Sequence, residues 1–493
     1  MEWQNYPLIR LIIPFTLGMI GANLFVSHMD LVVLFILCCA VLAFSFFFIK
    51  TLSTYKDGKF GLTATVLFFL IGMTLYTGKY QSIEQSLPQD TTFCQGILTE
   101  APIEKARSWA LHIQQGDTHL LLYAGKNLKD SITISSLQIG DTIFANVRHL
   151  NATNTCENDT FKTYNTYLFY QGICATAYAP PNQWHTKSCQ SSSSLFPSTK
   201  TLQEKLHLIY DEHGINGEVG SIIEAMTIGQ KAHLSKDSRI AYAHAGVSHV
   251  LALSGFHVGI IVLMLQVFFL RPLLSLRWQW VSNLFIITSL WVYAVITGAS
   301  PSLVRATLMF TILLLCQSFS RKALSINSCA IAFFVMLCIN PFYLYDIGFQ
   351  LSFASVVGIS LFSHHLTDTS KPLIFQIIFI TLICTLFTAP LAAYHFGCFS
   401  TLSIFSNLTL TFFVYLLMWS AILWWAFLWC DPINNSLTNL LNWTTTTMNS
   451  ITETIASFPF ATVEWHPNTL TTILCYVLLL TLTYFFTQHK QHS

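Results

Sequence analysis

Charge is scarce in this sequence. Charged residues make up 10% of the 493-residue chain, whereas about 25% is usual for soluble domains. Hydrophobic residues make up 53%, and the mean hydropathy is +0.54. This composition excludes an ordinary soluble protein and indicates a polytopic membrane protein. The formal net charge of +1 does not indicate a nucleic-acid or acidic partner, because it averages membrane and soluble segments.

Other signals are also missing. No A-x-A-like site follows the first apolar stretch, which argues for an anchor and against a cleaved signal peptide. No C-x-x-C or H-x-x-x-H pair gives zinc-ligand spacing, so we expect neither a metal nor a cofactor. Nine of the 13 cysteines lie in apolar stretches, where they serve as small hydrophobic residues. The others could form up to two disulfides, with three connectivities possible; they are Cys94, Cys156, Cys174 and Cys189.

Region 1–78 predicts three transmembrane helices. Its apolar stretches 7–25, 31–49 and 60–78 have the length of about 18 to 25 residues that crosses a bilayer. Lys50 and other lysines lie between the second and third stretches, whereas 27–30 holds no Lys or Arg. By the positive-inside rule the N-terminus is therefore cytoplasmic, and the region that follows lies outside the cytoplasm.

Region 79–188 predicts a small extracytoplasmic β domain. Alternating runs such as HLLLYAG and DTIFANVRHL, punctuated by Gly and Asp, are typical of strands and compatible with a barrel. The Ser-rich run CQSSSSLFPSTK begins a predicted linker over 189–216. The hydrophilic part, 79–215, holds ten basic and twelve acidic residues, so it carries no strong electrostatic signal for nucleic acid.

Region 217–430 predicts a second, helical membrane domain with apolar segments of mostly spanning length. Basic loops alternate along it, as the positive-inside rule requires. The 31-residue stretch 400–430 would then have to return to its own side, as a broken or re-entrant hairpin does. Region 431–467 predicts a helix over 437–458, either interfacial or an ordinary surface helix. Region 468–493 predicts a last transmembrane helix and a short tail.

Polar residues recur at four places in the apolar segments. An ionisable group at mid-bilayer costs about 2.5 kcal/mol or more, so such groups usually face a bundle interior or water. We therefore predict one polar passage through the membrane. Its candidate lining residues are His249, Ser254, Gly255, His257, Ser300, Ser302, Arg305, Asp346, Gln350, His395 and Asn407.

Simpler explanations stay open for individual residues. His249 could lie at the headgroup level, and Ser254 could bond to a helical carbonyl. Gly255 and Gly259 have the spacing of a close helix-packing face. Arg305 could extend to the membrane surface, and Asp346 could be a loop residue or a helix cap.

Breaks at 298–301 and 340–341 favour an anionic substrate. Gly and Pro interrupt the apolar pattern there, so helix ends are expected at membrane depth. The N-terminal end of a helix attracts phosphate through its free N–H groups. Arg305 adds a fixed positive charge beside the first break.

Three strings together resemble the competence domain of the ComEC family. They are IGQKAHLSKDSRIAYAHAGVSHVLALSGFHVGII, TGASPSLVRATLM and GFQLSFASVVGI, and the similarity covers residues 220 to about 430. The outer domain is similar to the family's OB-fold region, notably in LQIGDTIFANVRHL and YLFYQGICATAYA. The resemblance implies a channel, not an enzyme, that passes one DNA strand through the bacterial inner membrane during natural transformation.

The resemblance also implies partners. They are single-stranded DNA, a periplasmic DNA-binding receptor, and a cytoplasmic helicase or strand-binding protein. Longer family members carry a metallo-β-lactamase-like domain, and no HxHxDH-type cluster occurs here, so a separate nuclease is expected. An OB-type surface holds single strands by aromatic stacking and basic contacts. Candidates in the outer domain are Lys105, Arg107, Trp109, Tyr123, Arg148, Tyr164 and Tyr167.

Two other functions remain as alternatives. The polar residues alone would also suit a transporter of another anionic polymer or of a lipid precursor. An intramembrane serine protease, with Ser254 as nucleophile and a distant base such as His395, is the third possibility. Ala252 stands where a Gly-x-Ser-Gly motif would place glycine, and no second motif supports that role.

Overall fold

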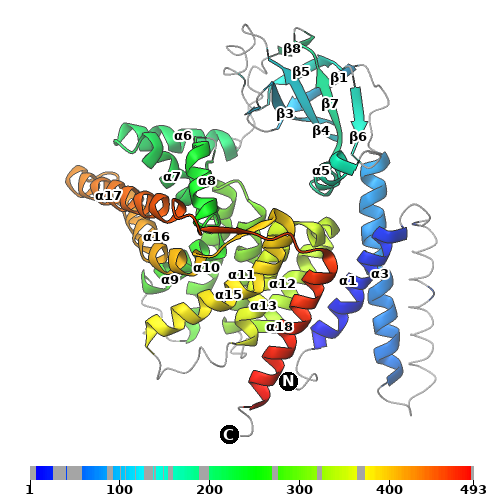
Figure 1. The fold of residues 1–493 in the computed structure, drawn as a ribbon. Helices are drawn as coiled ribbons and strands as arrows, with labels where there is room; N and C mark the ends of the chain where they lie inside the picture. Colours follow the sequence, from blue (N-terminus) through cyan, green and yellow to red (C-terminus); the bar gives the residue numbers. More distant parts are fainter. Residues whose placement is uncertain are drawn as a thin grey trace. The chain divides into compact units, whose positions relative to one another are not determined.

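The structure is a computed structural model that describes most of the chain. The described residues are 7–25, 31, 40, 58–85, 93–99, 102–105, 107–116, 118–126, 137, 140–147, 149–153, 159–181, 183–187, 199–231, 233–268, 276–318, 325–362 and 372–489. Contacts divide the chain into two compact units. Unit 1 comprises residues 1–196 and 334–346, and unit 2 comprises 197–333 and 347–493. Figure 1 shows the helices and strands of both.

Two long helices of unit 1 pack closely together. Helix α1 (Pro7–Phe25) matches the first predicted span, and α3 (Gly58–Gln85) contains the third. The second predicted span, 31–49, falls almost wholly outside the described residues. The two helices meet at glycines: a Cβ atom added at Gly18 would lie 2.0 Å from the carbonyl oxygen of Phe69, and one at Gly72 would lie 2.1 Å from that of Phe15. Small residues at such crossings let the backbones approach.

The β domain of unit 1 holds a sheet of eight strands. They are β1 (Phe93–Leu98), β2 (Ile103–Glu104), β3 (Ser108–Gln115), β4 (Thr118–Gly125), β5 (Thr142–Asn146), β6 (His149–Ala152), β7 (Ile173–Ala179) and β8 (Trp184–Lys187). The pairing order is β6-β7-β4-β3-β1-β5-β8, and β2 pairs with β3. Within the described residues β6 and β8 do not pair, so the predicted OB-like barrel is not closed there. The β domain itself is confirmed.

Alternation explains which face of each strand is buried. In β1 exposed and buried side chains alternate, and its buried Cys94 and Leu98 join Leu111, Ile143 and Trp184 in the core of the domain. Helix α5 (Asp159–Tyr170) precedes β7 and packs against it. A 3-10 turn, η4 (Pro341–Tyr345), also belongs to unit 1, where Phe342 packs against Tyr76 of α3 and Phe169 of α5.

Three amphipathic helices precede the membrane helices in unit 2. They are α6 (Thr199–Glu212), α7 (Gly217–Thr227) and α8 (Lys236–His244). Helix α6 corrects the predicted linker, because half of 189–216 is helical. Tyr210 of α6 is fully buried, stacked on Trp424 and hydrogen-bonded to Thr227 of α7. This burial of apolar and aromatic side chains ties α6 to the core.

The helices of the second block follow the predicted apolar segments. They are α9 (Gly255–Phe268), α10 (Leu276–Ile296), α11 (Pro301–Ser318), α12 (Ser325–Ile339), α13 (Ile347–Leu361), α15 (Leu373–Phe396), α16 (Ser403–Ala426) and α18 (Thr469–His489). Among the described residues, five helices are long and apolar enough to cross a membrane: α3, α10, α11, α15 and α16. Shorter apolar helices include α1, α9, α12, α13 and α18.

Helix α16 and the following helix α17 (Asp431–Ala456) bring the chain back beside the segment that precedes α16. Strand β9 (Cys398–Ser400) precedes α16, and β10 (Thr462–Glu464) follows α17. The two strands pair antiparallel, so the start of α16 and the end of α17 lie close together. Helix α17 packs along α16. The predicted return therefore occurs, but the predicted break within 400–430 does not, because α16 is one continuous helix.

Helix α17 packs against other helices along one face, so it is not a free surface helix. It contacts α7, α8 and α16, and its buried face is rich in threonine. Its buried Thr438 accepts a hydrogen bond from the indole N–H of Trp424, at 2.8 Å. Threonine can also bond to its own helical carbonyls, as Thr444 and Thr452 do. The hydroxyls of Thr444 and Thr452 are therefore satisfied although the face is buried, whereas that of Thr445 has no partner among the described residues.

Candidate functional site

Ser254 and His257 form a cap at the start of α9. The hydroxyl of Ser254 lies 2.9 Å from Nδ1 of His257, and the backbone N–H of Ser254 donates to the same nitrogen at 3.3 Å. A backbone N–H can only donate, so Nδ1 is the acceptor and the neutral ring carries its proton on Nε2. In a capping box, the side chain of the third helical residue accepts the backbone N–H of the residue before the helix. His257 makes this contact with Ser254, so histidine stands here in place of the usual glutamate.

This contact bears on the protease alternative. The structure pairs Ser254 with His257 and not with His395, which hydrogen-bonds instead to Gln350 of α13, at 3.0 Å. No carboxylate orients His257: within the described part of the chain its buried Nε2 atom has no hydrogen-bond partner. A helix cap therefore explains the pair, and the triad geometry of a serine hydrolase is not formed.

The face of α9 next to this cap packs against α11. A Cβ atom added at Gly255 would lie 3.6 Å from Ala306, and one at Gly259 would lie 3.5 Å from Phe310. Both are ordinary contact distances, so this face packs against α11 but leaves room for a Cβ atom at either glycine. Arg305, beside Ala306, is 2% exposed and donates from Nη2 to the carbonyl of Gly348 at 2.9 Å. It lies inside the protein and does not extend to the surface.

His249 lies in the turn before α9 and reaches α16. Its side chain lies near those of Asn407 and His257. The same turn holds Gly246, whose φ of +76° is rare for other residues. A Cβ atom there would lie 2.6 Å from that of Ser400, so only glycine fits this approach between the turn and β9.

The predicted break between α10 and α11 is present, and its backbone has two positive φ angles. Gly298 has a φ of +82° and Ala299 a φ of +49°, and α11 begins at Pro301. Ser300 and Ser302 lie half-buried at this break. A Cβ atom added at Gly229, which follows α7, would lie 3.1 Å from the carbonyl oxygen of Thr297. The break therefore lies against the amphipathic helices.

Five membrane helices form a closed cycle of contacts. Helix α9 packs against α11, α11 against α13, α13 against α15, α15 against α16, and α16 against α9. Each helix contributes at least one of the predicted polar residues. They are Ser254 and His257 at α9, Ser302 and Arg305 on α11, Gln350 on α13, His395 on α15 and Asn407 on α16.

These residues gather at one end of the ring. Each lies within about two turns of a helix end, since a turn takes 3.6 residues. The hydrogen bonds from Arg305 to Gly348 and from His395 to Gln350 join the ends of α11, α13 and α15, and His249 lies near Asn407 of α16. Four helices begin at this end, namely α9, α11, α13 and α16, and α15 ends there. The predicted residues thus form one polar layer.

Asp346 is the exception among the predicted residues. It belongs to unit 1, where it is the C-terminal cap of η4, as one of the simpler explanations predicted. Its carboxylate lies 3.5 Å from the amide nitrogen of Gln171 at the end of α5. Within unit 1, Asp346 therefore lies beside the end of α5.

The β domain holds a second polar and aromatic site. A cavity of about 510 Å³ lies between α5 and the sheet, and Lys105, Tyr123, Tyr164 and Tyr167 line it. The hydroxyls of Tyr123 and Tyr164 lie 3.1 Å apart, and the rings of Tyr164 and Tyr167 are stacked with centroids 6.5 Å apart. Burial and the contact with Tyr164 raise the pKa of Tyr123, so its phenol stays neutral. Four of the seven predicted outer-domain residues therefore share one cavity.

The remaining outer-domain predictions have separate outcomes. Trp109 does not line this cavity; Lys126 lies over its ring at 5.1 Å. Arg107 is exposed outside the cavity, and Arg148 lies outside the described residues. Two histidines that sequence reasoning missed, His112 and His119, also line the cavity. Their positions on adjacent strands β3 and β4 would have placed them near Tyr123, had the strand register been known.

The cysteines of the β domain are described only in part. Cys94 and Cys174 are buried free thiols, and burial raises the pKa of Cys94 to about 11. Neither therefore forms one of the disulfides considered from the sequence. Cys156 and Cys189 lie outside the described residues, so a bridge between them stays a prediction.

The ring of apolar helices and the further spanning helices define a multi-pass α-helical membrane protein. The model of the Competence protein family matches residues 226–490, which is more than half of the chain. The chain belongs to this family and is a ComEC-type competence protein, as the sequence resemblance predicted.

A curated relative agrees with this assignment. The chain is 30% identical over 249 residues to the ComE operon protein 3 of Bacillus subtilis (strain 168). The alignment covers 50% of this chain and 30% of the relative, so the chain matches only part of that protein. No solved structure matches.

Proposed function

We propose that this protein passes a single DNA strand across the inner membrane of a bacterium during natural transformation. Membership of the Competence protein family supports a role in DNA uptake. The observation that carries the proposal is the polar layer, to which all five helices of the ring contribute. Polar groups at membrane depth are costly and usually face a bundle interior or water, so a shared layer favours a passage.

The direction of the helices suits an anionic polymer. Each helix N-terminus carries a partial positive charge of about half an elementary charge and unpaired N–H groups. Four of the five ring helices begin in the polar layer, and Arg305 adds a full charge. Together they would stabilise a phosphate backbone entering the ring.

His257 would supply a donor within the layer. Its Nε2–H is buried and has no acceptor among the described residues. A buried donor without a partner costs about 1 to 3 kcal/mol. A phosphate or base that reached this atom would recover that cost, which favours the polar layer as a contact surface over a role in packing alone.

The cavity of the β domain would hold the strand before it enters. Tyr164 and Tyr167 are 43% and 48% exposed, and their stacked rings offer faces on which bases can stack. Stacking contributes about 1 to 3 kcal/mol per base. Lys105 at the same cavity would contact the backbone. Because the domain has no excess of basic residues, stacking would contribute more than charge, and binding would depend only weakly on salt.

The topology that we propose places the N-terminus in the cytoplasm and the β domain outside it. The paired strands β9 and β10 then lie on the outer side with the polar layer, and α18 leads to a cytoplasmic tail. A periplasmic DNA-binding receptor would deliver the strand, and a cytoplasmic helicase or strand-binding protein would receive it. A separate nuclease would degrade the strand that stays outside.

An import assay tests the function. A naturally competent host that lacks its own copy is supplied with this chain, and labelled DNA is followed outside and inside the cell. Deletion is expected to abolish cytoplasmic label and to leave label bound outside. Asn407→Leu, in the polar layer, should lower import, whereas Thr409→Val, whose hydroxyl bonds only to its own helix, should not. Normal cytoplasmic label in the deletion strain would refute the proposal.

A binding assay tests the cavity separately. Single-stranded DNA is titrated into the purified full chain and followed by fluorescence anisotropy. Loss of about 1 to 3 kcal/mol on Tyr164→Ala or Tyr167→Ala corresponds to affinities about 5- to 150-fold lower. Tyr178→Ala is the matched control, because Tyr178 is 39% exposed on β7 and does not line the cavity. Equal affinities for all three variants would show that the cavity does not hold the strand.

A further inference from the structure

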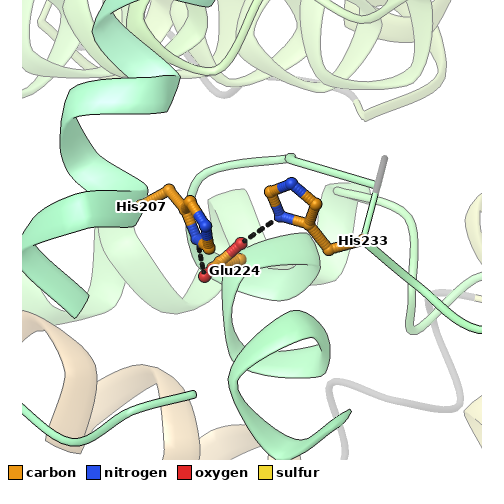
Figure 2. A group of neighbouring side chains, drawn as sticks. All are labelled: His207, Glu224 and His233. Atoms are coloured by element: carbon orange, nitrogen blue, oxygen red, sulfur yellow. Dashed lines mark hydrogen bonds and ion pairs between the residues drawn. The ribbon is translucent and has the colours of Figure 1, made fainter. Parts of the chain in front are cut away.

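Outside the ring, a buried carboxylate lies between two histidines. Oε1 of Glu224 is 2.7 Å from Nδ1 of His207, and Oε2 is 3.3 Å from Nδ1 of His233 (Figure 2). The three residues each offer a ligand atom, and these atoms all lie within 4.8 Å of one another. The residues come from α6, α7 and the connection between α7 and α8, and all belong to unit 2.

We propose that His207, Glu224 and His233 bind a divalent transition-metal ion of the zinc type. Two imidazole nitrogens and one carboxylate form a donor set that zinc accepts, with a fourth position left for water or another ligand. The side chain of Glu224 is 2% exposed, whereas those of His207 and His233 are 27% and 45% exposed. The carboxylate thus closes the inner side of the site, and the histidines leave an open side through which an ion can enter.

The surroundings orient His207 as metal sites require. Its Nε2 atom lies 3.6 Å from a carboxylate oxygen of Asp211, one turn further along α6. A metal-bound histidine usually donates its other N–H to a carboxylate or carbonyl, which fixes the ring and strengthens the ligand. With Nδ1 toward the ion and Nε2–H toward Asp211, His207 would have this arrangement. The ring of His233 already lies beside it, with centroids 4.3 Å apart.

The helices that carry the ligands are fixed by neighbouring contacts. Gln203, one turn before His207 on α6, donates to the carbonyl of Ile228 at 2.9 Å. The hydroxyl of Tyr210, one turn after it, lies 3.1 Å from that of Thr227. Residues 203, 207 and 210 share one helix face, so this face is held against α7 on both sides of the site. A bound ion would replace the hydrogen bonds between Glu224 and the two histidines, so the three side chains would have to separate slightly to surround it.

A short sequence motif does not mark this site. The ligands are 17 and 9 residues apart, a spacing that neither C-x-x-C nor H-x-x-x-H describes. The proposal therefore replaces the sequence-based expectation that no metal binds. The site would cross-link α6, α7 and the connection that carries Gly229, which packs against the break before α11. It does not depend on the proposed transport of DNA.

The test uses the full chain purified in detergent, stripped with a chelator and then supplied with Zn²⁺ alone. After desalting, elemental analysis should find about one zinc ion per chain, as the one such cluster among the described residues predicts. His233→Asn and Glu224→Gln should lose it, and Asp211→Asn should bind about 10- to 100-fold more weakly. His244→Asn is the matched control, because His244 is exposed at the end of α8 and outside the cluster.

Thermal unfolding provides a second measurement. Zn²⁺ should raise the Tm of the wild-type chain and of His244→Asn, but not that of His233→Asn. The largely exposed His233 makes this variant the least disturbing one, so it decides the question even if Glu224→Gln does not fold. Zinc retained equally by His233→Asn and wild type, or by neither, would overturn the proposal.

Discussion

The crossing of α1 and α3 gives the sharpest prediction about stability. At this crossing the backbone of each helix lies directly over a glycine of the other. A Cβ atom added at Gly72 would lie 2.1 Å from the carbonyl oxygen of Phe15, and one at Gly18 would lie 2.0 Å from that of Phe69. Both obstacles are backbone atoms, which cannot turn away as a side chain can. The variant Gly72→Ala therefore forces the helices apart.

The magnitude follows from the distances. Ordinary contact begins at 3.4 Å, so the helices would have to separate locally by about 1.3 Å. Overpacking of this kind costs about 1 to 3 kcal/mol, and occasionally more. Alanine is also favoured over glycine within a helix by about 1 kcal/mol. The steric cost is the larger effect, so Gly72→Ala should destabilise the chain.

Two glycines of the same helix pair provide controls. A Cβ atom at Gly21 would lie 3.7 Å from the nearest atom of Phe69, and one at Gly61 would meet nothing within 4 Å. Gly21→Ala and Gly61→Ala should therefore leave stability unchanged or raise it, whereas Gly18→Ala should behave like Gly72→Ala. Thermal unfolding of the full chain in detergent measures the difference. If Gly72→Ala proved as stable as Gly61→Ala, the close approach of α1 and α3 would be wrong.

Three further predictions concern the other sites. Ser254→Ala removes the hydroxyl that donates to Nδ1 of His257, and the loss of this hydrogen bond should cost about 0.5 to 1.5 kcal/mol without abolishing import per folded molecule; complete loss of import would instead favour a nucleophile. Gly246→Ala adds a clash with Ser400 to an unfavourable φ of +76°, so its Tm should fall further than that of Gly214→Ala, which has a φ of +78° and nothing within 4 Å; equal Tm values would contradict this. Burial raises the pKa of the Cys94 thiol from 9.0 to about 11. The contribution of the neutral thiol to the free energy of unfolding is therefore complete below pH 9 and is lost between pH 9 and 11. Unfolding across that range should depend less on pH in Cys94→Ala, and identical profiles would argue against the shift.

Local patterns predicted the helices well. The apolar stretch 303–320 corresponds to α11 (Pro301–Ser318), and its start follows from Gly298 and Pro301. Length and hydropathy suffice for such helices, because a bilayer imposes both. The sequence pattern gave a wrong prediction where contacts between distant segments determine whether a helix forms. Residues 199–212 follow a Ser-rich run that favours a linker, yet they form α6 because Tyr210 and its neighbours find partners on α7 and α16.

The segment after α16 is a second place where the sequence pattern did not predict the structure. Charge bias requires the chain to come back to its own side, and the sequence suggests a break within 400–430 as the means. The structure achieves the return with α17, a Thr-rich helix that is too polar to be recognised as the partner of a spanning helix. The pairing of β9 with β10 involves residues more than sixty positions apart, which no local pattern reveals.

The sequence by itself determined the class of protein, the order of its helices, the family and most residues of the polar layer. These depend on composition, on runs of apolar residues and on motifs whose members lie close together in the chain. Only the tertiary structure decided which polar residues meet. It brought Arg305 to Gly348 and Gln350 to His395, and it brought His207, Glu224 and His233 together. The physical reason is that contacts between distant segments depend on how whole helices pack, and a linear pattern does not encode that packing in any one place.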